Sequence, residues 1–183
     1  MDLWWAIGLG ALALAGVGLY LSSTAGRLDR LHRRIQTSQL SLDAHLLRLS
    51  AVALEIAAAG VLDPASSMLI ADAAHGARTS VDDDAEARAR WESALTQALA
   101  ATLADPVDVG EVRHSELGDG LMDELAAACL RVELARRFLN DAVRACRQLR
   151  GQRSVRWFRL AGHTPMPATW EMDDTIPNGL VRQ

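Results

Sequence analysis

Residues 3–21 read LWWAIGLGALALAGVGLYL and contain no charged side chain. At a rise of 1.5 Å per residue, a helix of this length is about 28 Å long, close to the roughly 30 Å hydrocarbon core of a bilayer. Trp4 and Trp5 stand at one end and Tyr20 at the other, as in the aromatic belts of membrane helices. The stretch therefore predicts a transmembrane anchor over residues 1–25.

A cleaved signal peptide is the alternative to this anchor. Ser23-Thr24-Ala25 would serve as a cleavage site, but the apolar stretch is longer than the usual ~7–15 residues and no arginine precedes it. We therefore expect an uncleaved, single-pass cell-membrane anchor. Arginines follow the stretch closely, and the positive-inside rule then places the helical body in the cytoplasm and Met1 outside. These arginines are Arg27, Arg30, Arg33 and Arg34.

Small residues recur on one face of the apolar stretch. They are Gly8, Ala11, Ala15 and Gly18. Because small side chains let two membrane helices approach closely, this face is a candidate for self-association. The alternative is that glycine and alanine are simply common in membrane spans and in this alanine-rich chain.

The composition of the chain favours helix over sheet. Alanine and leucine supply 60 of the 183 residues, and both are strong helix formers. We expect an all-α fold in which the transmembrane helix continues into an elongated antiparallel three- to four-helix bundle over 26–160, followed by an irregular tail over 161–183. All 19 basic residues are arginine, so Schiff-base and P-loop lysine chemistry are excluded.

A heptad pattern predicts that the first helix runs on to Gly60. Leu28, Ile35, Leu42, Leu49 and Ile56 recur every seven residues, with Leu31, Ser38, His45 and Val52 at the complementary position. Asp63 and Pro64 then predict an N-cap and first helical position. Residues 79–84 interrupt the next helical pattern, so 64–104 form either one bent helix or two.

A polar loop is expected over 105–120, followed by a helix over about 121–150. Its seams are Leu125, Val132, Leu139 and Cys146, and Leu121, Ala128, Ala135 and Ala142. Cys129 and Cys146 would lie about 25 Å apart along this helix, too far for a disulfide. We expect two buried free thiols and a disordered tail beyond the bundle.

Charge is segregated along the chain, with an excess of acids over 82–124 and of arginines over 125–160. Pairing inside the fold is the simplest interpretation. The Arg/Trp segment 144–160 could instead contact anionic lipid. One bent helix over 64–104 would leave Arg150 about 45–50 Å from the membrane, whereas two helices would bring it back. No nucleic-acid motif is present, so no nucleic-acid partner is expected.

Three segments resemble the LemA family. Residues 135–143 read ARRFLNDAV, similar to the family's ARRFYNxxV signature; 169–174 read TWEMDD, similar to its closing stretch; and 91–99 read WESALTQAL, similar to its central helix. Leu139 replaces the family's usual tyrosine. The resemblance implies an antiparallel helical bundle on a membrane anchor and no established catalytic activity.

The sequence therefore favours a non-enzymatic membrane scaffold or accessory protein, LemA-like, that binds an unidentified protein partner or copies of itself. No catalytic, cofactor-binding or metal-ligating residues are predicted. The alternatives are an envelope enzyme or regulator of proteolysis with an unrecognised site, and anionic-lipid sensing through 144–160.

We expect Phe138 and Leu139 to pack inward. The candidate interaction residues are Arg136, Arg137, Phe138, Asn140, Asp141, Arg153, Arg156, Trp157, Trp170 and Glu171.

Overall fold

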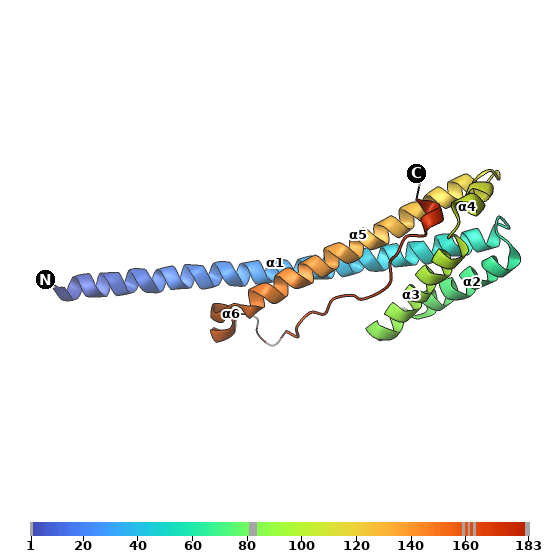
Figure 1. The fold of residues 1–183 in the computed structure, drawn as a ribbon. Coiled ribbons are helices and arrows are strands. Elements are labelled where there is room, and N and C mark those ends of the chain that lie inside the picture. Colours follow the sequence, from blue (N-terminus) through green and yellow to red (C-terminus); the bar gives the residue numbers. More distant parts are fainter. Residues whose placement is uncertain (1, 81–83, 159, 161, 163, 182–183) are drawn as a thin grey trace. The chain divides into compact units, whose positions relative to one another are not determined.

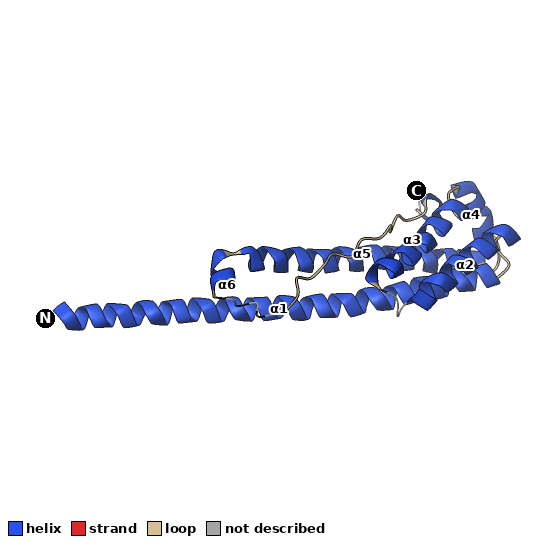
Figure 2. Cartoon of the chain, turned by 90° about the horizontal axis from the view of Figure 1, so that it is seen from below, coloured by secondary structure: helices blue, strands red, loops and turns tan. Residues whose placement is uncertain are grey.

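The computed structural model describes residues 2–80, 84–158, 160, 162 and 164–181 (Figure 1). This part of the chain is helical and contains no strand (Figure 2), which confirms the all-α prediction. Asp82, Asp83 and Arg159, which belong to patterns discussed above, lie outside it. The elements are α1 (Asp2–Ala58), α2 (Pro64–Thr79), α3 (Ala85–Thr102), α4 (Pro106–Arg113), α5 (Gly118–Gly151), α6 (Arg153–Trp157) and the 3₁₀ helix η2 (Asn178–Leu180).

The chain divides into two compact units. Unit 1 comprises Met1–Thr37 and Asn140–Thr169, and unit 2 comprises Ser38–Leu139 and Trp170–Gln183. Helices α1 and α5 each contribute a segment to both units.

The apolar part of α1, in unit 1, is exposed at Trp4, at Trp5 and from Ile7 to Tyr20. Leu12, Leu14 and Leu19 are each 74–75% exposed. The helix is long and apolar enough to cross a membrane, and only 6% of its apolar 18-residue segment is buried. Because the core helix of a soluble protein buries its apolar side chains, α1 does not serve as such a core helix over this stretch.

The predicted junction after α1 is confirmed. Gly60 has a φ of +68°, a left-handed conformation that glycine adopts at helix ends without steric cost. Asp63 then accepts hydrogen bonds from the backbone N–H groups of Ala65 and Ser66, and Pro64 is the first residue of α2.

Residues 64–102 form two helices. Asp84 caps the second of them, α3, by accepting hydrogen bonds from the N–H groups of Glu86 and Ala87. Helices α2 and α3 lie side by side in both views (Figures 1 and 2), and Gly76 of α2 packs directly against the Trp91 ring of α3. The absence of a side chain at Gly76 permits this close approach.

The prediction of a polar loop over 105–120 is wrong, because α4 occupies residues 106–113. Asp105 accepts a hydrogen bond from the N–H of Val107 and Pro106 is the first helical residue. This is the same Asp-Pro signal that starts α2, so the signal was present in the sequence. Val109 is the buried residue of this short helix.

Unit 2 has a core built from α1 and from parts of both α5 seams: Leu125, Val132 and Leu139 of one, and Ala128 and Ala135 of the other, are buried, whereas Leu121 is half-buried. Leu42, Leu49 and Ile56 of the predicted α1 seam are buried. The complementary seam is only partly correct: Val52 is buried, but His45 is half-buried. Leu46 and Ala53, four residues after Leu42 and Leu49, are 1% and 0% exposed.

The tail is ordered against unit 2 over 170–181, so the prediction of disorder is wrong there. Pro177, Gly179 and Leu180 are buried, and η2 packs against the α3–α4 junction. The N–H of Gly179 donates to the carbonyl of Leu103 at 3.0 Å. The backbone of the tail thus approaches another backbone at a position without a side chain.

Gly179→Ala is expected to destabilise unit 2 by about 2 kcal/mol, through overpacking at a site that cannot yield easily. A Cβ at Gly179 would lie 2.6 Å from both the Leu103 carbonyl oxygen and Val109 Cγ2. Gly120→Ala is the matched control: a Cβ there meets no atom within 4 Å, and alanine favours helix by about 0.5–1 kcal/mol. Thermal unfolding of the full chain in detergent checks both; equal midpoints would contradict the expectation.

Candidate functional site

A polar cluster in unit 2 joins α3, α5 and the tail. Arg136 of α5 donates two hydrogen bonds to Asp174, from Nε at 2.7 Å and from Nη2 at 2.9 Å. The N–H of Asp173 donates to Ser93 Oγ of α3 at 3.0 Å. A bidentate arginine–carboxylate pair fixes both position and direction, so it holds the tail in one register on α5. The three segments that resemble one family therefore meet at one place.

Arg88 extends this cluster to α1. Its guanidinium lies 5.5 Å from the centroid of the Trp170 ring, within the range of a cation–π contact. The same side chain pairs with Asp43 of α1 at 2.9 Å. Arg88 therefore links α1, α3 and the tail, and Trp170 is half-buried beneath it.

Glu92 is the unusual titratable group of this cluster, one turn after Arg88 on α3. Its side chain is buried, with 3% exposed. Desolvation raises the pKa of its carboxyl to about 7; Arg88 opposes this shift and Asp43 adds to it. Among the residues that the structure describes, Glu92 Oε2 has no hydrogen-bond partner. The group can therefore exchange a proton near neutral pH, a property common at functional sites.

Sequence reasoning did not select Arg88, Glu92 or Asp174. A signal for Glu92 was available, because it lies on the α3 face that also carries Leu95 and Leu99, all of them buried. A glutamate on an apolar helix face is either paired or carries a shifted pKa. No comparable local signal marks the contact of Arg88 with Trp170, which are far apart in sequence.

Segment 135–143 of α5, which carries the predicted signature, has some side chains in the interior and others at the surface. Asn140 and Leu139 are buried, and Arg136 is engaged with Asp174. Phe138 is 56% exposed, so the prediction that it packs inward is wrong: one residue step turns it away from the seam that Leu139 follows. Arg137 pairs with Glu133, as its helical spacing predicts.

The ion pairs found among the described residues do not include one that joins the acidic stretch to an arginine of α5. Arg144 pairs with Asp141 at 2.6 Å within α5, and Arg136 pairs with the tail. Arg113 is engaged by Asp119 and Asp123, all within the acidic stretch itself. Internal neutralisation between 82–124 and 125–160 is therefore not the pattern found.

The end of α5 returns to the apolar part of α1 within unit 1. Tyr20 Oη and Ser154 Oγ form a hydrogen bond of 3.2 Å, so α6 lies level with the end of the apolar stretch. Trp157 is 85% exposed, and Arg153 and Arg156 are exposed beside it. This is the geometry expected for two helices over 64–104, in which segment 144–160 returns to the end of the apolar stretch of α1.

The small-residue face of α1 is open in this single chain. Gly8, Ala11, Ala15 and Gly18 are all exposed, and a Cβ built on either glycine meets no atom within 4 Å. Glu171 of the tail is also exposed.

The two cysteines are free and buried, as expected. Burial raises the pKa of the Cys129 thiol to about 12, which keeps it protonated and unreactive. Within the described part of the chain, no three histidine, cysteine, aspartate or glutamate side chains gather as metal ligands would.

Comparisons with protein-family models, with curated proteins and with solved structures find no match for this chain. The residues themselves therefore carry the functional argument. The polar cluster can hold the tail and take up a proton, and unit 1 presents aromatic and basic side chains at the end of an apolar helix.

Proposed function

We propose that this protein is a single-pass membrane scaffold that acts by binding other proteins, or copies of itself, at the cytoplasmic face. The observation that carries the proposal is the exposure of the apolar stretch of α1 at Trp4, at Trp5 and from Ile7 to Tyr20. In water this surface would be an aggregation hazard, whereas in a bilayer it is the favourable surface for a helix.

The distribution of charge supports this orientation. Unit 1, which contains the apolar stretch, has ten arginines against three aspartates, a net charge of +7 by sequence; unit 2 is acidic. Basic residues beside a membrane helix favour the cytoplasmic side, where the anionic leaflet attracts them. The remaining helices would form an antiparallel bundle beyond the anchor, as the resemblance to the LemA family implies.

A stripe on α5 is the best candidate for the binding surface of this scaffold. Leu130, Leu134 and Phe138 are spaced four residues apart, so they share one helix face. They are 47%, 40% and 56% exposed. Apolar side chains gathered on one surface mark interaction sites more often than single exposed ones do.

Native purification of the tagged full chain tests the scaffold proposal. We expect a stoichiometric partner or a homo-oligomer, and its loss in Leu134→Glu/Phe138→Glu. The matched control is Met68→Glu/Val107→Glu, which places the same charges on exposed apolar residues elsewhere in unit 2. A wild-type chain that remains monomeric, or a complex that survives the α5 substitutions, would contradict the proposed surface.

Gly8→Leu/Gly18→Leu tests association through the membrane helix by the same purification. Loss of the homo-oligomer in this variant is the result expected if the small-residue face joins the copies.

Contact of α6 with anionic lipid is a second candidate function. The hydrogen bond between Tyr20 and Ser154 favours it, because it holds Ser154, three residues before the exposed Trp157, at the end of the apolar stretch. Tryptophan prefers the membrane–water interface.

In a chain whose other tryptophans are replaced by phenylalanine, Trp157 fluorescence is expected to shift to the blue on reconstitution into anionic nanodiscs. Brominated lipid tails should also quench the Trp157 fluorescence, because the ring would leave water and approach the tails. A reporter carrying only Trp91, which belongs to unit 2, is the control. Identical spectra of Trp157 in detergent, neutral lipid and anionic lipid would eliminate this candidate.

A further inference from the structure

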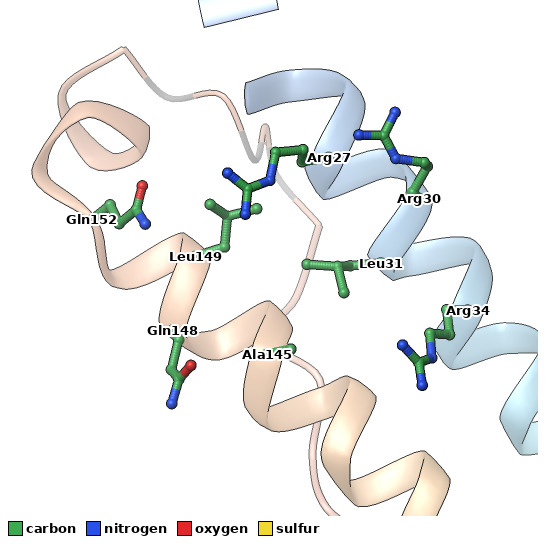
Figure 3. Close-up of a pocket in the computed structure, with 8 residues that line it drawn as sticks. All are labelled: Arg27, Arg30, Leu31, Arg34, Ala145, Gln148, Leu149 and Gln152. Carbon is green, nitrogen blue, oxygen red and sulfur yellow. The ribbon is translucent and has the colours of Figure 1, made fainter. Parts of the chain in front are cut away.

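A cavity of about 410 Å³ lies between α1 and α5 within unit 1. Arg27, Arg30 and Arg34 line it from α1, and Gln148 of α5 and Gln152, the N-cap residue of α6, line it from the other side. Figure 3 shows Arg27, Leu31 and Arg34 reaching from α1 toward α5. We call the cavity with these five polar residues the arginine groove.

The arginine groove holds three positive charges and no carboxylate among its lining residues. Neighbouring arginines of unit 1 are neutralised: Arg33 pairs with Asp29 and Arg144 with Asp141. Within the described residues, no ion pair is formed by Arg27, Arg30 or Arg34. Like charges held close together repel one another, so an anion in the groove would be favoured by all three.

The chemistry of the lining selects the kind of anion. Guanidinium groups present paired N–H donors that match the oxygens of a phosphate, and the amides of Gln148 and Gln152 add neutral donors from the facing side. Leu31 and Leu149 supply an apolar wall. The volume exceeds that of a bare phosphate and lies in the range of small-ligand sites, about 300–1,000 Å³.

The position of the groove along α1 suits a ligand at the membrane surface. Arg27 is the first charged residue after Asp2, and it lies about 9 Å beyond Leu21 at 1.5 Å per residue. The interfacial layer outside the hydrocarbon core is about 5–7 Å thick on each side, and an arginine side chain can extend back into it.

We propose that the arginine groove is a binding site for a phosphate-bearing anion, such as the phosphodiester headgroup of an anionic lipid. Arg27 and Arg34 bind the phosphate oxygens, and Gln148 and Gln152 contact the remainder of the ligand. That the phosphate belongs to a lipid depends on the membrane anchoring proposed above. That the groove binds a phosphate does not depend on it.

Binding is measured on the full chain purified in neutral detergent, in two arms. One arm titrates phosphatidylglycerol and reads the bound number by native mass spectrometry; the other titrates inorganic pyrophosphate by calorimetry. The groove variant is Arg27→Gln/Arg30→Gln/Arg34→Gln. The control variant, Arg33→Gln/Arg78→Gln/Arg90→Gln, removes the same charge at exposed arginines outside both the groove and segment 144–160. Circular dichroism checks that each variant is folded.

We expect the groove variant to bind at least tenfold more weakly than wild type, and the control variant to bind within about twofold of it. Binding in the lipid arm identifies the headgroup as the ligand, and binding in the pyrophosphate arm alone identifies a soluble phosphate. Equal losses in both variants would show attraction to net charge and overturn the proposal, as would no binding in either arm. Because the chain is in detergent, a failure of membrane anchoring leaves the pyrophosphate arm interpretable.

Discussion

Leu12→Arg/Leu14→Arg is expected to lower the membrane-bound fraction of the chain by more than tenfold. Both leucines lie near the centre of the apolar stretch and are 74% and 75% exposed. An arginine at the centre of a membrane helix costs about 2.5–3.5 kcal/mol on insertion scales, and nothing in the described chain lies near enough to shield it. Flotation of membranes on a density gradient measures the bound fraction.

Leu40→Arg/Leu47→Arg is the matched control for this prediction. These leucines are exposed on the same helix and receive the same charges, but they lie beyond Arg34, outside the apolar stretch. The control is expected to float with the membranes as wild type does. Equal flotation of both double variants would show that another part of the chain binds the membrane.

Glu92→Gln is expected to raise the free energy of unfolding at pH 8 by up to about 3 kcal/mol. The folded-state pKa of about 7 lies above the ordinary glutamate value of about 4.5, so the protonated carboxyl favours the folded state. The stabilisation is complete below about pH 4.5 and is lost as pH rises through about 7. A neutral amide of similar shape avoids the cost of a buried charge at high pH.

The measurement is urea unfolding of the full chain in detergent at pH 5, 6, 7 and 8. Wild type should lose stability across this range, whereas Glu92→Gln should lose much less of it, and the two should nearly agree at pH 5. Glu171→Gln, which removes an exposed carboxylate from the tail, should keep the wild-type slope. If the free energy of unfolding fell equally with pH in wild type and Glu92→Gln, Glu92 would be ionised over the whole range from pH 5 to 8.

Local signals made much of the helical framework predictable. Asp63-Pro64 fixed the start of α2, Gly60 marked the turn after α1, and the α5 seams follow from spacing alone. Helix α4 was missed although Asp105-Pro106 repeats the first signal, because eight residues with a single buried side chain show no periodicity. The second α1 seam was wrong at His45, where the next residue, Leu46, is the buried one, since spacings of three and four are both compatible with one helix face.

The polar cluster and the ordered tail depend on contacts between distant residues. Arg136 and Asp174 are 38 residues apart, and each alone looks like an ordinary surface charge. Likewise, Gly179 is informative only because Leu103 lies against it. The arginine groove was visible in the sequence as a basic run after the apolar stretch, but its facing glutamines come from the last turn of α5 and the residue that caps α6.

The intact mass of the chain, tagged at its C-terminus and recovered from membranes after alkaline carbonate extraction, tests the anchor most directly. An uncleaved anchor predicts the full-length mass in the membrane pellet, with residues 1–25 retained. A chain shortened by about 25 residues and released into the supernatant would identify the apolar stretch as a cleaved signal. It would also contradict the membrane-bound scaffold.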